Sequence, residues 1–306
     1  MMAVPAIETI QLQKVFGDRT AVKGLTLRVE QGEVFGFLGP NGAGKTTSIK
    51  MLLSLIAPTS GSARLLGAPL GNLDMLGRIG FLPEHFRFQE WLTAREFLEL
   101  HGQLHDMEAR TLAQRINALL ERVGLAEFRQ KQLRTFSKGM LQRIGLAQAL
   151  INQPALVFLD EPTSGLDPVG RLLVRDIIRE LREQGTSVFL NSHLLSEIEV
   201  TCDRVAFIRH GEVVRVLEMA ALEGDPTAVS IRARGLTPNV VEGLAQWGEE
   251  VVANGEQLSL KIRGEDVLPE ITRYLVGQKV DIYGINPQRM SLEAIFIETV
   301  GQDGGL

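Results

Sequence analysis

A glycine-rich segment that ends in a lysine and two threonines is the part of the sequence best suited to chemistry. It has the spacing G-x-x-x-x-G-K-[ST] of a phosphate-binding loop and reads Gly39-Pro40-Asn41-Gly42-Ala43-Gly44-Lys45-Thr46-Thr47. Glycines let successive backbone N–H groups converge on an anion, and a helix that follows adds its positive N-terminal dipole. Lys45 can reach the terminal phosphates of a nucleotide, and Thr46 can place its hydroxyl on Mg²⁺. An ordinary glycine-rich turn is the alternative, and the apolar strand before the loop and the helix after it argue against that.

Two neighbouring carboxylates follow an apolar segment further along the chain. Residues 155–159 are apolar throughout, as in a strand buried on both faces of a sheet, and Asp160 and Glu161 come next. Ligands of α/β folds bind at the carboxyl ends of the strands. Asp160 is suited to hold Mg²⁺, directly or through water, and Glu161 is suited to orient and polarise an attacking water. An Asp-Glu pair before Pro162 can also simply start a turn, but beside a phosphate loop it predicts a nucleoside triphosphatase.

Shorter patterns accompany these two elements. They are TFSKGMLQR at 135–143, Ser164-Gly-Leu-Asp167, Asn191-Ser-His193, and Phe16 about 23 residues before the glycine-rich loop. In this order, the set resembles the ATP-binding subunits of ABC transporters: a signature motif, a D-loop, a switch histidine and an aromatic ring that stacks on adenine. The resemblance covers roughly residues 7–215.

The resemblance implies a mechanism and a set of partners. In this family two copies pack head to tail, with ATP between the phosphate loop of one and the signature motif of the other. Ser137 and Gly139 would then meet a γ-phosphate, His193 would contact the same phosphate, and Asp167 would cross the dimer interface. Taken alone, Ser137 and Asp167 are equally suited to cap helices, and His193 to a structural role. The expected cofactors are ATP and Mg²⁺, and the expected partners are a second ATPase subunit, most simply in a homodimer, and an integral membrane permease.

Three positions depart from the usual family pattern. Glu84 stands where the family has the Q-loop glutamine, and a carboxylate there can still bind Mg²⁺. Lys138 replaces a signature glycine, and it either adds positive charge near the γ-phosphate or points to solvent. Met140 replaces the signature glutamine. These departures, and the ending Met290-Ser-Leu-Glu-Ala-Ile-Phe-Ile-Glu, are similar to those of subunits that serve ABC-2-type exporters.

The elements that must position these residues follow from the apolar patterns. Residues 7–34 alternate as antiparallel strands do, while 34–38, 155–160, 186–191 and 205–209 are denser strands. Helices are expected at about 45–55, within 90–152 and at 168–184. Strands that alternate with helices predict an α/β core, which the resemblance identifies as a P-loop nucleotide-binding domain with a mixed sheet, an antiparallel β subdomain and a helical subdomain.

A boundary is expected around 223–227, which gives an ATP-binding domain over 1–224 and an accessory domain over 225–306. The helical subdomain would span about 84–152. In the second segment, strands at 228–233, 250–253, 257–263 and 278–284 alternate with helices at 238–247, 265–276 and 291–300, which predicts a small α+β domain.

Composition and charge limit the classes of function. The net charge is −5, so the chain lacks the basic surplus by which proteins displace counterions from nucleic acid. A single cysteine, Cys202, excludes an internal disulfide and fits a reducing compartment, where we expect it to be inert. The start of the sequence does not read as a signal peptide, and no uncharged apolar run in it approaches the length needed to span a bilayer. With the resemblance, this places the protein in the cytoplasm, peripherally on the inner face of the cell membrane.

Three other functions would also use a nucleotide-binding chain of this kind. A non-transport ABC ATPase would carry two nucleotide domains or long coiled-coil arms, and a GTPase would carry an N-K-x-D motif. The sequence shows neither feature. An importer subunit, whose additional C-terminal domain is regulatory, stays open. In the family that the sequence resembles, the helical segment 84–152, with its aromatic and basic stretch 85–91, docks onto the membrane partner. Phe86, Phe88 and Trp91 are equally compatible with a core.

Overall fold

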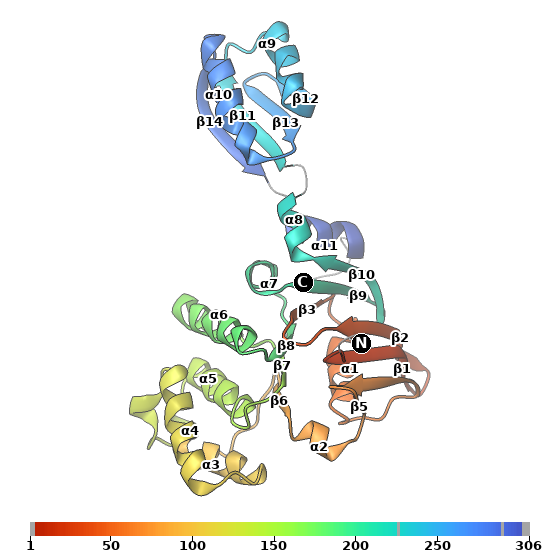
Figure 1. Cartoon of the computed structure of the whole chain (residues 1–306), viewed down its shortest axis with the longest axis vertical. Helices are drawn as coiled ribbons and strands as arrows, with labels where there is room; N and C mark the ends of the chain where they lie inside the picture. Colours follow the sequence, from red (N-terminus) through yellow and green to blue (C-terminus); the bar gives the residue numbers. More distant parts are fainter. Residues whose placement is uncertain (1–3, 225–226, 289–290, 302–306) are drawn as a thin grey trace. The chain divides into compact units, whose positions relative to one another are not determined.

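The computed structural model describes residues 4–224, 227–288 and 291–301. Contacts divide the chain into two compact units, one that runs to Leu217 and resumes at Ile297, and one that comprises Glu218–Phe296. The change of unit thus lies before the segment 223–227, in which residues 225–226 are outside the described residues. Figure 1 shows both units in the colours of the sequence.

The first unit is built on a six-stranded sheet with strand order β10-β9-β3-β8-β7-β6. Its strands are β3 (Val34–Leu38), β6 (Ile79–Leu82), β7 (Leu156–Asp160), β8 (Ser187–Asn191), β9 (Arg204–Arg209) and β10 (Glu212–Glu218). The pairs from β9 through β6 are parallel, and β3, β7 and β8 are buried along their whole length. Continuous apolar runs are what a parallel strand covered on both faces requires. The expected α/β core is confirmed.

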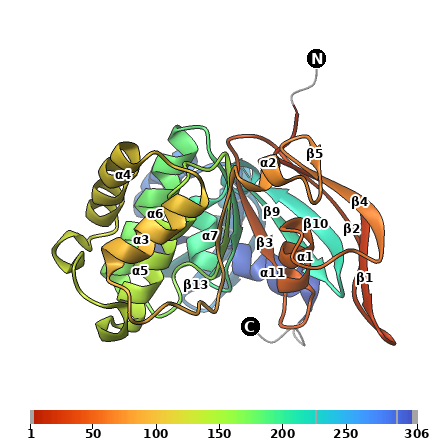
Figure 2. The ribbon, with the colours of Figure 1, turned by 90° about the horizontal axis from the view of Figure 1, so that it is seen from below.

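Two different layers cover this sheet, as Figure 2 shows from below. Helices α5 (Lys138–Ala149), α6 (Pro168–Glu183) and α7 (Leu195–Thr201) lie on one side, and α1 (Lys45–Leu52) lies on the other. Beyond α1 is an antiparallel sheet of order β2-β1-β4-β5, formed by β1 (Ile7–Phe16), β2 (Arg19–Val29), β4 (Ser60–Leu65) and β5 (Ala68–Pro69). The short helix α2 (Leu73–Leu76) precedes β6.

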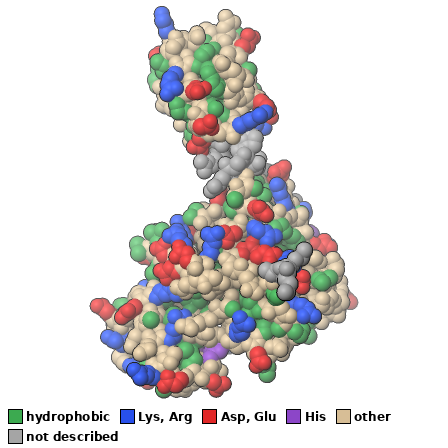
Figure 3. All heavy atoms as spheres, in the orientation of Figure 1, with side chains coloured by type: hydrophobic (Ala, Val, Ile, Leu, Met, Phe, Trp, Pro, Cys, Tyr) green, Lys and Arg blue, Asp and Glu red, His purple; other side chains and the backbone are tan. Residues whose placement is uncertain are grey.

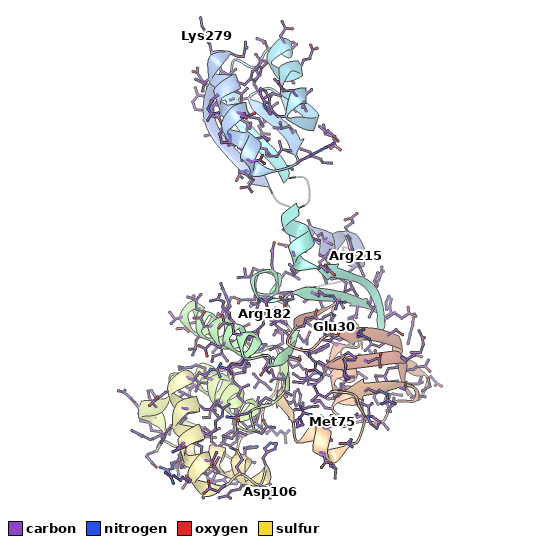
Figure 4. The ribbon with its side chains drawn as sticks, viewed as in Figure 1. Glu30, Met75, Asp106, Arg182, Arg215 and Lys279 are labelled. Atoms are coloured by element: carbon purple, nitrogen blue, oxygen red, sulfur yellow. The ribbon has the colours of Figure 1, made fainter. Side chains whose placement is uncertain are left out.

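The predicted helical segment contains α3 (Ala94–Leu104) and α4 (Ala109–Arg122) before α5. Thr93 and Glu96 form a capping box at the start of α3, which satisfies orphan backbone donors there. Asp106, labelled in Figure 4, has a φ of 54° in the connection between α3 and α4. No helix among the described residues is long and apolar enough to span a bilayer.

The second unit contains a four-stranded antiparallel sheet with strand order β12-β13-β11-β14. Its elements are α8 (Met219–Gly224), β11 (Thr227–Arg234), α9 (Pro238–Gly243), β12 (Gly248–Asn254), β13 (Gln257–Ile262), α10 (Leu268–Gly277) and β14 (Asp281–Gln288). From β11 to β14 the connectivity is β-α-β-β-α-β, the ferredoxin-like arrangement. Apolar side chains of α9 and α10, such as Val240 and Ile271, form one buried cluster with alternate strand residues such as Ile231 and Leu260. The final helix, α11 (Leu292–Val300), follows Met290, which lies outside the described residues.

Two of the element boundaries that differ from the prediction do so for the same physical reason. The first helix ends at Leu52 rather than 55, and the last strand of the sheet begins at Asp281 rather than 278. Ser54 and Lys279, the latter labelled in Figure 4, have left-handed φ angles of 58° and 59°. Leu55 N–H bonds to Lys50 O and Val280 N–H to Leu275 O, which is the pattern of a Schellman cap. Glycine usually occupies this position and marks the end of a helix in a sequence. Serine and lysine occupy it here, so the sequence did not indicate where these two helices end.

Candidate functional site

A cleft of about 690 Å³ lies where the loop between β3 and α1 meets the ends of β7 and β8. Most of the predicted phosphate-loop residues line it, together with residues from β1, β2 and the segments that follow β6, β7 and β8. The lining residues are Phe16, Arg19, Ala21, Gly39, Asn41, Gly42, Ala43, Gly44, Lys45, Thr46, Thr47, Glu84, Glu161, Asn191 and His193. Five segments that are distant in the sequence therefore contribute to one concave site, as is usual at the carboxyl edge of a parallel sheet.

The glycine-rich loop takes the backbone conformation that its sequence predicts. Gly44 has a φ of 98°, and a β-carbon at this position would lie 2.5 Å from the carbonyl oxygen of Ala21. Only glycine accommodates both the left-handed φ and this close approach. Gly44 is followed directly by α1, so the N-terminus of that helix points at the cleft.

Lys45 is held inside its own loop. Its Nζ donates hydrogen bonds to the carbonyl oxygens of Gly39 and Pro40, the latter at 3.1 Å. Burial lowers the pKa of Lys45, while the carboxylates of Glu161, Asp160 and Glu84 act in the opposite direction. The ammonium group is therefore desolvated, which strengthens its interaction with an anion that enters the cleft.

The two predicted acids occupy different environments at the end of β7. Asp160 is 2% exposed, and its carboxylate accepts a hydrogen bond from the side-chain amide of Asn191. Glu161 faces the cleft, where its Oε2 lies 2.6 Å from Nδ1 of His193. Asp160 and Asn191 are register partners in the β7–β8 pair, so the sheet itself brings the acids beside the Asn191-Ser-His193 segment.

Burial raises the pKa of both acids. For Asp160 the hydrogen bond from Asn191 opposes this rise, and for Glu161 the charge of His193 and its hydrogen bond do so. A carboxylate whose pKa is raised is a stronger base than one in water, which suits a residue that polarises water. Burial likewise raises the pKa of the Cys202 thiol, as expected for an inert cysteine.

The residues around Asp160 fit a Mg²⁺ ion. The side-chain oxygen of Asn191 is buried and has no hydrogen-bond partner among the described residues, although Asn191 lines the cleft. Such an oxygen is suited to accept a hydrogen bond from metal-bound water. Thr46 and Glu84 line the same cleft, so hydroxyl and carboxylate oxygens, which Mg²⁺ prefers, surround this position.

Besides Pro40 and the buried Asp160, three predicted site residues do not line this cleft. Ser137 is the N-cap of α5, where its hydroxyl accepts from Met140 N–H, and Gly139 lies in the first turn of α5. Asp167 caps α6 by accepting from Gly170 N–H at 2.8 Å. The capping roles considered from the sequence are therefore present. Lys138 is exposed, and its side-chain carbons lie against Gly165 in the loop before α6.

Several residues at the cleft were not predicted as site residues. Arg19 and Ala21, at the start of β2, face it beside Phe16, whose ring is half exposed. Asn191 was noted only as a neighbour of His193. Its position at the carboxyl end of a buried strand was the signal in the sequence that could have found it.

Comparison with known sequences and structures gives a consistent result. The family described as ABC transporter matches residues 22–164, and a domain described as the C-terminal domain of DrrA1-3-like ATP-binding proteins matches residues 227–300. An uncharacterized ABC transporter ATP-binding protein of Nostoc sp. is 44% identical over 285 residues, which cover 92% of this chain and 83% of the relative. The daunorubicin resistance ATP-binding protein of Streptomyces coeruleorubidus is 36% identical over 309 residues, which cover 99% of this chain and 98% of the relative.

Solved structures match the first unit. An ATP-binding subunit of an ABC transporter is 26% identical with a TM-score of 0.67, and the match covers 71% of this chain and 92% of that chain. An ATP-binding cassette in a dimeric post-hydrolysis state with ADP and Pi is 25% identical with a TM-score of 0.64, and that match covers 70% of this chain and 98% of the other.

Proposed function

We propose that this chain hydrolyses ATP as a dimer and thereby drives a separate ABC-2-type permease in export. The chain belongs to the family of ABC transporter ATP-binding proteins, and the proposal proceeds from this membership. The observation that carries the proposal is the contact between Glu161 and His193 in the same cleft as Lys45. In this proposal Glu161 is the base, His193 orients it, and Lys45 is the phosphate-binding cation of the same cleft.

Different residues of the cleft would bind the phosphates, activate the attacking water and stack on adenine. Lys45 exchanges its two carbonyl partners for the β- and γ-phosphates, and the backbone N–H groups of the loop bind the remaining oxygens. Glu161 accepts a hydrogen bond from the attacking water, and His193 holds both this carboxylate and the γ-phosphate in position. Phe16 offers its exposed ring face to adenine.

Thr46, Glu84 and Asp160 would hold Mg²⁺, with Asn191 fixing the orientation of Asp160. When bound, the ion supplies positive charge to the phosphate oxygens during the transfer. Asp160 itself is too deeply buried to line the cleft, which is consistent with an interaction through water.

A second copy of the chain would complete the site. Ser137 and Gly139 lie at the start of a helix, away from the cleft of their own chain, and Asp167 starts another helix in the loop beyond Glu161. Helix N-termini bind anions, so the start of α5 is suited to the γ-phosphate held by a partner. A head-to-tail homodimer is the simplest assembly that would bring the start of α5 to a partner's nucleotide.

Export is supported by the second unit and by the relatives that share it. The matched C-terminal domain is that of DrrA1-3-like proteins, and two relatives are named for daunorubicin and linearmycin resistance. The membrane role places the protein on the cytoplasmic face of the membrane, beside its permease.

The exposed residues between β6 and α3 are proposed to dock onto that permease. Phe86 and Phe88 stack on each other at 4.3 Å and contact Phe97, so they belong to a local aromatic cluster. Trp91 is 68% exposed and Arg87 is also exposed, which leaves both free for a partner.

The charge reversal Arg87→Glu is expected to weaken assembly with the permease while basal ATPase activity stays unchanged, because Arg87 does not line the cleft. Copurification with a coexpressed ABC-2-type permease measures assembly, and turnover of the isolated subunit measures basal activity. The matched reversal Arg129→Glu, another exposed arginine of the helical segment, is the control. Full assembly by Arg87→Glu would contradict docking here.

Replacing Asn191 with leucine is expected to weaken Mg²⁺-dependent ATP binding by about 10- to 100-fold, the effect typical of losing a residue that orients a metal ligand. Asp160 would lose its hydrogen-bond donor, and its pKa would rise further. Nucleotide titrations with Mg²⁺ and with a chelator separate the two contributions. An equal loss of affinity in the chelator would show that Asn191 supports the cleft and not the metal.

A further inference from the structure

Glu161 has an unusual backbone conformation. Its φ is 54°, in the left-handed region that residues with a β-carbon seldom adopt. Strained backbone of this kind persists only where surrounding contacts fix it, and it concentrates at functional sites. The conformation sets the direction in which the carboxylate leaves the chain, and here that carboxylate reaches His193 in the cleft.

Hydrogen bonds from three directions hold the Glu161 backbone. Its N–H donates to the carbonyl oxygen of Asn191 at 2.8 Å, and its carbonyl oxygen accepts from Ser164 N–H at 3.1 Å. The third bond comes from a side chain: Nε2 of Gln142, in α5, donates to the same carbonyl at 3.0 Å. The first two bonds are local to the sheet edge and the turn, and of these three bonds the one from Gln142 connects Glu161 to the helical segment.

Gln142 contacts the Glu161 peptide, whereas the next residue along α5 contacts a different part of the chain. Arg143 donates to the carbonyl oxygens of Val123 and Gly124, which join α5 to the end of α4. The start of α5 also packs on the loop that follows Glu161, since a β-carbon on Gly139 would lie 3.3 Å from Leu166. The position of α5 is therefore transmitted directly to the Glu161 peptide.

We propose that Gln142 is a positioning residue that keeps Glu161 in its left-handed conformation and thereby aims its carboxylate at the attacking water. The inference rests on the proposed ATPase function. Because Ser137 starts the same helix, the residue expected to meet the partner's nucleotide and the residue that holds this chain's base share one rigid element. A displacement of Ser137 by its contact is thus transmitted to Glu161 through residues 138–142 of α5.

The test uses the full chain and two substitutions. Gln142→Met keeps the length of the side chain but removes the donor, and Gln142→Glu places an acceptor against the Glu161 carbonyl. Both are expected to lower kcat by about 10-fold or more, a typical effect of removing a supporting hydrogen bond at an active site. The ATP dissociation constant and the melting temperature are expected to stay as in the parent, and the ATP-bound dimer is expected to persist longer on size exclusion.

Gln148→Met is the matched control, because Gln148 lies on the same helix and is also partly buried. In a Glu161→Gln background, Gln142→Met is expected to cause no further loss. Unchanged kcat in Gln142→Met would overturn the inference, as would a parallel loss of kcat, ATP affinity and melting temperature, which indicates a structural role. If Glu161→Gln itself retained parent activity, the proposed function would fail instead.

Discussion

Replacing Glu161 with glutamine is expected to lower ATP turnover by about 10³-fold, within the range that a general base contributes. Glutamine keeps the shape of the side chain and can still contact His193, but it cannot polarise water as a carboxylate does. Burial raises the pKa of Glu161, so the native residue is a better base than an exposed glutamate. Phosphate release under saturating ATP measures the loss.

The same substitution is expected to trap a dimer. With hydrolysis blocked, ATP stays between the two subunits, and the population shifts to the closed form. Size exclusion with and without ATP shows this as a change from monomer to dimer. Glu33→Gln is the matched control: Glu33 is also buried, with its pKa raised by burial, but it pairs with Arg204 outside the cleft. Monomers that persist in ATP would contradict the shared nucleotide site.

Replacing Lys45 with methionine is expected to weaken ATP binding by about 10- to 100-fold, because hydrogen bonds to charged groups contribute about 1.5–3 kcal/mol. Turnover falls with it, since the same ammonium group neutralises charge on the phosphates in the transition state. Fluorescent-nucleotide titration and ATPase assays measure the two losses.

The same substitution, Lys45→Met, is not expected to lower the stability of the nucleotide-free protein. Burial lowers the pKa of Lys45, so the charged form is less favourable in the folded chain than in the unfolded one. Methionine has no charge to desolvate, and the melting temperature without nucleotide is expected to be equal or higher. Lys50→Met, at an exposed position of the same helix, is expected to change neither binding nor turnover. A large drop in melting temperature for Lys45→Met would show instead that the lysine supports the loop.

Features built from contiguous residues could be predicted from the sequence, whereas features that depend on contacts between distant residues could not. The phosphate loop, its strand and its helix are contiguous, so spacing and hydropathy were enough to identify them. Asn191 was overlooked because its role depends on the register between β7 and β8, which pairs it with Asp160 thirty-one residues away. Gln142 belongs to the TFSKGMLQR pattern, but its role was overlooked because it depends on contact with the Glu161 peptide nineteen residues away.

Ion pairs on the surface likewise depend on contacts between residues that are distant in the sequence. In the view of Figure 3, acidic and basic side chains are interspersed over the first unit. Several form pairs between distant segments, such as Arg204 with Glu33 and Arg182, labelled in Figure 4, with Asp203. The net charge was readable from composition, but the pairs depend on which strands become neighbours.

The position of β3 within its sheet has a consequence for synthesis of the protein. This strand enters the phosphate loop, yet both of its neighbours, β8 and β9, lie about 150 residues or more further along the chain. A nascent chain therefore holds β3 with both edges unpaired until residues 187–209 have left the ribosome. The nucleotide site cannot form in order of translation, and it assembles only when the last strands of the sheet arrive.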